Sequence, residues 1–113
     1  MEHKMRLHND PFIKIKNGTK TVELRLNDEK RSLVKIGDTI EFTNRSNEET
    51  IIVDVIDIKK YNSFEELYSH FNKIEMGYNE EDIIDPKDME KYYTKEEQDK
   101  YGVLGIVIKI KED

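Results

Sequence analysis

The chain of 113 residues contains no cysteine, and no apolar run approaches the roughly 20 residues that a membrane-spanning helix requires. The absence of cysteine excludes disulfides, thiolate metal sites and a cysteine nucleophile. The first residues, Met1–Lys4, lack the apolar core of a signal peptide, so we expect a cytoplasmic protein. The histidines do not share the spacing of metal ligands, and we expect neither a metal nor another cofactor; they are His3, His8 and His70.

Internal repeats, low-complexity runs and a phosphate-binding glycine loop are also missing. A chain of this length fits one domain with one modest core, since domains typically run to about 100–150 residues. Charged residues make up 39% of the chain and hydrophobic residues 35%. That composition would indicate disorder if the apolar positions were not phased into strands and helices. We therefore predict one globular domain over residues 1–113.

The formal net charge of -6 argues against strong nonspecific binding to nucleic acid, because that affinity comes mainly from neutralising phosphates. The charge is unevenly distributed, however. Residues 1–35 hold nine Lys or Arg against five Asp or Glu, whereas the remainder holds ten against twenty. A basic patch on an acidic body suits a short or single nucleotide unit better than a long duplex. A chance asymmetry between solvated faces is the alternative explanation.

The most informative stretch is Gly18–Arg25, which places lysine, glutamate and arginine around a strand that follows a turn. Val22, Leu24 and Leu26 alternate with a period of two, which predicts a half-buried strand with the intervening side chains facing solvent. Glu23 and Arg25 then share a face, close enough to pair with each other or to bind one polar ligand. Lys20 is expected in the turn after Gly18.

The remaining pattern predicts short helices and further strands. Asp10 is expected to cap a helix that runs through Pro11 and ends before Gly18, and Ser63 to cap a longer one whose apolar face reaches Phe71. Strands are expected around Ile40 and Phe42, from about 50 to 59 with both faces buried, and along the alternating residues 104–110. Two short helices are expected over 86–93 and 95–100. This order lacks regular βαβ alternation, which favours a mixed barrel.

The pattern Gly-x-Lys-x-x-Glu-x-Arg at Gly18, Lys20, Glu23 and Arg25, with the elements around it, resembles the ASCH domain, a relative of PUA-like RNA-binding folds. The resemblance extends over nearly all of the chain. It implies an α+β fold, namely a small mixed β-barrel with peripheral short helices. It also implies a ligand groove beside the motif, roofed by the loop after the main helix. Candidate ligand-binding residues are Lys20, Thr21, Glu23, Arg25 and Tyr78.

We therefore expect a module that binds RNA or a modified nucleoside in this cleft. The resemblance also implies an enzymatic alternative, because some small ASCH-like proteins are amidohydrolases that deacylate N4-acetylcytidine with a lysine, a threonine three residues later and a downstream glutamate. Lys20 and Glu75 match this pattern, but Glu23 stands where the threonine is expected. Candidate catalytic residues are therefore Lys20, Glu23 and Glu75. Nearby carboxylates are expected to raise the pKa of Lys20 and keep it protonated.

Two further interpretations stay open at this stage. Lys20, Glu23 and Arg25 are also consistent with an exposed ion-pair cluster that has no function, since charged residues on solvent-facing strands are ordinary. The acidic segment 72–100 is also consistent with a protein-interaction module.

Overall fold

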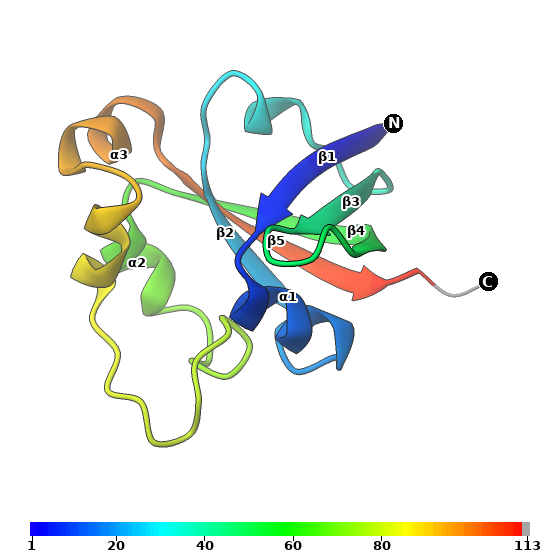
Figure 1. Ribbon diagram of the computed structural model, residues 1–113. Coiled ribbons are helices and arrows are strands. Elements are labelled where there is room, and N and C mark those ends of the chain that lie inside the picture. Colours follow the sequence, from blue (N-terminus) through cyan, green and yellow to red (C-terminus); the bar gives the residue numbers. More distant parts are fainter. Residues whose placement is uncertain (112–113) are drawn as a thin grey trace.

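The computed structural model describes residues 1–111, and its centre is a five-stranded mixed sheet curled into a half-barrel. The strands are β1 Glu2–Leu7, β2 Val22–Leu26, β3 Thr39–Asn44, β4 Thr50–Tyr61 and β5 Val103–Ile110. Their order across the sheet is β1-β3-β4-β5-β2. β1 pairs with β3 in parallel, and the other neighbouring pairs are antiparallel. The predicted α+β class with a mixed barrel-like sheet is confirmed (Figure 1).

Short helices connect and flank the strands. They are α1 Asn9–Lys16, the 3-10 helix η1 Arg31–Leu33, α2 Phe64–Tyr68, the 3-10 helix η2 Pro86–Lys91 and α3 Lys95–Tyr101. Figure 1 shows α2 and α3 grouped at one side of the sheet. None of the helices within residues 1–111 has the length and apolarity to cross a membrane.

Local capping signals predicted several helix ends. The Thr94 hydroxyl accepts a hydrogen bond from the Glu97 amide, and the Glu97 carboxylate accepts one from the Thr94 amide. The predicted capping box of α3 is therefore confirmed. Gly102 ends that helix at φ +74°, in the region that favours glycine. Ser63 likewise caps α2 through the Glu66 amide.

Other helix predictions were wrong in detail. α1 begins at Asn9, so Asp10 lies inside the first turn, where its carboxylate pairs with Lys14 at 3.2 Å instead of capping the helix. α2 ends at Tyr68, which leaves Phe71 outside the helix; its ring packs against β5, where a Cβ on Gly105 would lie 2.9 Å from it. The segment expected as a helix over 86–93 is a 3-10 helix.

The core lies on both faces of the sheet. One cluster packs α1 against the sheet through Phe12 and Ile15, and the other packs α2 against it through Phe64 and Leu67. β5 contributes alternate residues to the two clusters, because helices or loops cover both of its faces.

The two-sided burial predicted for β4 was wrong. Val53 and Val55 are buried, but Ile52 and Ile56 are exposed. An irregularity in the pairing with β5 lies between Val55 and Asp57, and it shifts the strand's alternation by one residue. Val53 and Val55 before the irregularity and Ile58 after it therefore pack on the same core cluster, although their spacing breaks the alternation.

Candidate functional site

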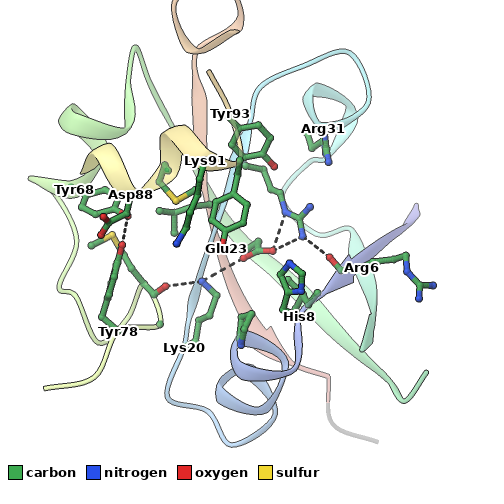
Figure 2. Close-up of a pocket in the computed structure, with 18 of the residues that line it drawn as sticks. Arg6, His8, Lys20, Glu23, Arg31, Tyr68, Tyr78, Asp88, Lys91 and Tyr93 are labelled. Atoms are coloured by element: carbon green, nitrogen blue, oxygen red, sulfur yellow. Dashed lines mark hydrogen bonds and ion pairs between the residues drawn. The ribbon is translucent and has the colours of Figure 1, made fainter. Parts of the chain in front are cut away.

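A cleft of about 570 Å³ opens between the end of β1, the strand β2, the loop at 76–78 and the segment from η2 to Tyr93. Figure 2 shows how these separate segments surround it. Lys20, Glu23, Arg25 and Tyr78 line this cleft, so four of the predicted site residues are brought together. The motif on β2 forms its floor.

The floor is a buried ion-pair cluster. The Arg25 guanidinium donates to Glu23 Oε2 from Nε at 3.0 Å and from its terminal nitrogen at 2.8 Å. Lys20 Nζ lies 3.4 Å from Glu23 Oε1, and the two residues are only 6% and 4% exposed. The prediction that Glu23 and Arg25 share a face is confirmed. The prediction that this face is solvated is wrong, because chain segments far away in sequence cover it.

The electrostatics of the cluster follow from this burial. Burial alone raises the pKa of Glu23, but Arg25 and Lys20 outweigh it and the pKa is lowered, so the carboxylate stays charged. Burial lowers the pKa of Lys20 more than Glu23 raises it. The predicted upward shift of the Lys20 pKa is therefore wrong, because the desolvation of a buried ammonium outweighs its attraction to the carboxylate.

Three successive carbonyls of the loop hold it against the motif. Glu75 O accepts from the amides of Thr21 and Val22, Met76 O from Lys20 Nζ at 2.8 Å, and Gly77 O from Lys14 Nζ at 2.7 Å. Lys20 Nζ also donates to Val22 O at 2.8 Å. The ammonium of Lys20 thus has partners for all three of its protons, with Glu23 as the third.

Two predicted site residues lie elsewhere. The Glu75 side chain is exposed and accepts a hydrogen bond from the Asn72 amide at 3.1 Å, so its carboxylate is not part of the cleft wall. Thr21 meets its neighbours through the backbone, as donor to Glu75 O and acceptor from the Ile108 amide. The backbone of Glu75, rather than its side chain, reaches the motif.

One wall of the cleft carries a pair of tyrosines. The hydroxyls of Tyr68 and Tyr78 lie 2.6 Å apart, and burial raises the pKa of both, most strongly that of Tyr68. Asp88 of η2 lies beside them (Figure 2), and its negative charge adds to the effect of burial in raising the pKa of Tyr78. Sequence reasoning identified Tyr78 but missed Tyr68, which lies in α2.

Cations and further aromatics form the rim, and sequence reasoning missed them as well. They are Arg6, His8, Arg31, Arg45, Lys91, Tyr92 and Tyr93. These residues come from the ends of β1 and β3, from η1 and from η2, which no local pattern relates to the motif. The only signal in the sequence was the basic bias of the first 35 residues.

The cleft also lies at the open seam of the half-barrel. β1 and β2 are the two edge strands of the sheet, and a terminal nitrogen of Arg25 donates to Arg6 O at 3.1 Å. The same side chain therefore holds Glu23 and ties one edge of the sheet to the other. Within residues 1–111, no group of His, Asp and Glu has the arrangement to hold a metal ion.

Comparisons with known proteins agree with this architecture. The ASCH domain family model matches residues 5–112. A crystal structure of the hypothetical protein PH0355 is similar with 30% identity and a TM-score of 0.83, covering 98% of this chain and 100% of that one. The solution structure of protein PF0455 from Pyrococcus furiosus has 32% identity and a TM-score of 0.71, with 100% of both chains covered.

More distant structures share the fold. The crystal structure of ASCH from Zymomonas mobilis has 18% identity and a TM-score of 0.69, covering 96% of this chain and 66% of that one. No functionally curated protein matches the chain. The family match and the two full-length relatives confirm the resemblance first seen at Gly18–Arg25, and the chain belongs to the ASCH domain family.

Proposed function

We propose that residues 1–113 form a single ASCH domain that binds RNA or a nucleotide in the cleft beside the Gly18–Arg25 motif. The observation that carries this proposal is the composition of the cleft. In a chain with a net charge of -6, this cleft gathers arginines, lysines and tyrosines on its walls. Its volume of about 570 Å³ lies within the range of about 300–1,000 Å³ that is typical of small-ligand sites.

The rim supplies groups that suit phosphate and base. Guanidinium and ammonium groups bind phosphate oxygens, and tyrosine rings stack on bases regardless of sequence. Tyr92 is 55% exposed at this rim, so its ring is accessible to a base. The acidic remainder of the chain repels long nucleic acid, which favours a single nucleotide or a short single-stranded segment.

The motif residues have distinct roles in this proposal. Lys20 and Glu23 neutralise each other at the floor and hold the loop at 76–78 in place. Arg25 at the floor and Tyr78 on one wall form surfaces against which the ligand lies. Thr21 and Glu75 act through their backbones, as supports of that loop.

The test is a binding titration with short single-stranded RNA and with mononucleotides, in which calorimetry measures the affinity. Tyr92→Ala is expected to lower affinity about tenfold, because stacking on an aromatic ring is worth about 1–3 kcal/mol per base. Tyr92→Phe keeps the ring and is expected to retain affinity. Ile83→Ala, at an exposed side chain outside the cleft, is the matched control. Absence of binding to every compound would refute the proposal.

One observation favours hydrolysis of an N-acylated pyrimidine nucleoside as a second candidate. Burial lowers the pKa of Lys20, as a lysine acting as a base requires. Three features speak against it: Glu23 replaces the expected threonine, the Glu75 carboxylate lies outside the cleft, and backbone carbonyls engage the Lys20 amine. Incubation with nucleosides including N4-acetylcytidine, followed by chromatography, tests it. Turnover that Lys20→Ala abolishes would establish the enzyme, whereas binding without turnover supports the module.

A further inference from the structure

The two ends of the cleft differ in their chemistry. Figure 2 shows Tyr68, Tyr78 and Asp88 gathered at one end, while Arg6, His8 and Arg31 lie at the other. The side chain of Lys91 extends over the middle. A ligand that fills this cleft therefore meets a phenol–carboxylate group at one end and a cationic group at the other.

Glu23 is poorly placed to read a base. It is only 4% exposed, and its two oxygens already face Lys20 and Arg25. Asp88, by contrast, is exposed at the cleft surface. No cation of residues 1–111 lies within ion-pair distance of the Asp88 carboxylate. Among the acidic side chains that line the cleft, Asp88 is therefore the one that is open to a ligand.

Asp88 can only accept hydrogen bonds at this end of the cleft. The hydroxyls of Tyr68 and Tyr78 lie 2.6 Å apart and bond to each other. Asp88 lies beside this pair (Figure 2). An ionised carboxylate has acceptor oxygens and no proton to donate. A ligand group that binds Asp88 must therefore be a hydrogen-bond donor.

The opposite end has an unpaired guanidinium. Arg6 pairs with Glu48 at 2.6 Å and Arg31 with Asp28 at 2.5 Å. Within residues 1–111, Arg45 has no ion pair and is exposed. Its backbone amide donates to Leu7 O, which fixes the start of its side chain beside the end of β1. Arg45 is thus free to bind an anionic group such as a phosphate.

From these observations we infer that the cleft binds a nucleotide whose base carries an exocyclic amine, with the amine on Asp88 and the phosphate on Arg45. This inference rests on the proposed function and adds the class of base and its orientation. Carboxylates accept hydrogen bonds from the cytosine N4 amine in the same way, and the amine of adenine is an equivalent donor. Uracil and hypoxanthine present a carbonyl oxygen at that position, which an ionised Asp88 repels.

The experiment separates the two ends. Calorimetry measures the affinities for CMP, UMP and cytidine, and for AMP and IMP. The base of CMP differs from that of UMP, and the base of AMP from that of IMP, in the exocyclic amine. Asp88→Asn is expected to reduce the preference for CMP over UMP, or for AMP over IMP, about tenfold while leaving the ratio of CMP to cytidine affinity unchanged. Arg45→Ala is expected to lower CMP affinity about fivefold and to leave cytidine affinity and base preference unchanged.

Matched variants control for charge. Glu90→Gln removes the same charge from the same helix, outside the cleft, and Lys109→Ala removes an exposed cation from β5. Both are expected to bind as the unmodified chain does. Nucleotide binding with no preference for the amine would overturn the class of base, and exchanged effects of Asp88→Asn and Arg45→Ala would overturn the orientation; either result leaves the proposed function standing. Failure of every nucleotide to bind would overturn the proposed function together with it.

Discussion

Lys20 lies directly against Gly77: a Cβ on Gly77 would be 2.9 Å from Lys20 Cδ, and φ at Gly77 is +103°. The loop can approach the motif this closely only because the position has no side chain. The buried ammonium and the loop that covers it are therefore parts of one arrangement.

The first prediction compares two glycines. Gly77→Ala is expected to destabilise the fold by roughly 2–4 kcal/mol, through the strained φ together with displacement of Lys20. Gly37→Ala is the control, because Gly37 has a similar φ of +95° and no atom within 4 Å of the added Cβ. It is expected to cost only about 1–2 kcal/mol. Urea denaturation of both variants measures the difference, and equal losses would contradict the contact.

The second prediction concerns the buried carboxylate. Glu23→Gln is expected to lower the free energy of unfolding by about 3 kcal/mol, because it leaves Lys20 and Arg25 buried without their counter-charge. Lys20→Met in the same chain removes one of those cations, so the double variant is expected to lose less than the sum of the single losses. Denaturation of the four chains gives the coupling. Strict additivity would show that the pair is energetically independent.

The third prediction is a pH dependence outside the cleft. The His3 ring, the Lys35 amide and the N-terminus, all bonded to Asp38, hold its pKa at about 2 instead of the usual 3.8. A carboxyl group whose pKa is lower in the folded chain than in the unfolded chain stabilises the fold at any pH above the unfolded-state pKa. This contribution is lost as the pH falls from 3.8 toward about 2.

Asp38→Asn is therefore expected to be less stable than the unmodified chain at neutral pH, with the gap closing between pH 3.8 and about 2. Urea denaturation across this range measures it. Asp99→Asn on the exposed side of α3 controls for the loss of one charge. A gap that stays constant with pH would show that the carboxyl has no altered pKa.

The fourth prediction tests the link across the seam of the half-barrel. Arg25→Lys retains a charge near Glu23, but one ammonium does not reproduce the fork that holds Glu23 and reaches Arg6 O. We expect a loss of about 2 kcal/mol in stability and faster amide hydrogen exchange in β1. Arg45→Lys, at a guanidinium with no ion pair in residues 1–111, is expected to change neither. Unaltered exchange in β1 would contradict the link.

Much of the local structure was predictable from neighbouring residues. The capping box at Thr94, the helix end at Gly102 and the shared face of Glu23 and Arg25 all depend on residues within one turn or one strand. The family motif was also visible, because its residues stand close together in the chain. Where these predictions failed, as at Asp10 and at the irregularity after Val55, the boundary depended on partners elsewhere.

By itself, then, the sequence determined the element types, the class of fold and the position of the motif, because periodicity and capping are properties of adjacent residues. Only the tertiary structure decided that Lys20 and Glu23 are buried, that the Glu75 carboxylate is not in the cleft, and that Asp88 and Arg45 are. Burial and pKa depend on what covers a side chain, and here the cover comes from segments more than fifty residues away. The chemistry of the cleft is therefore a product of long-range packing.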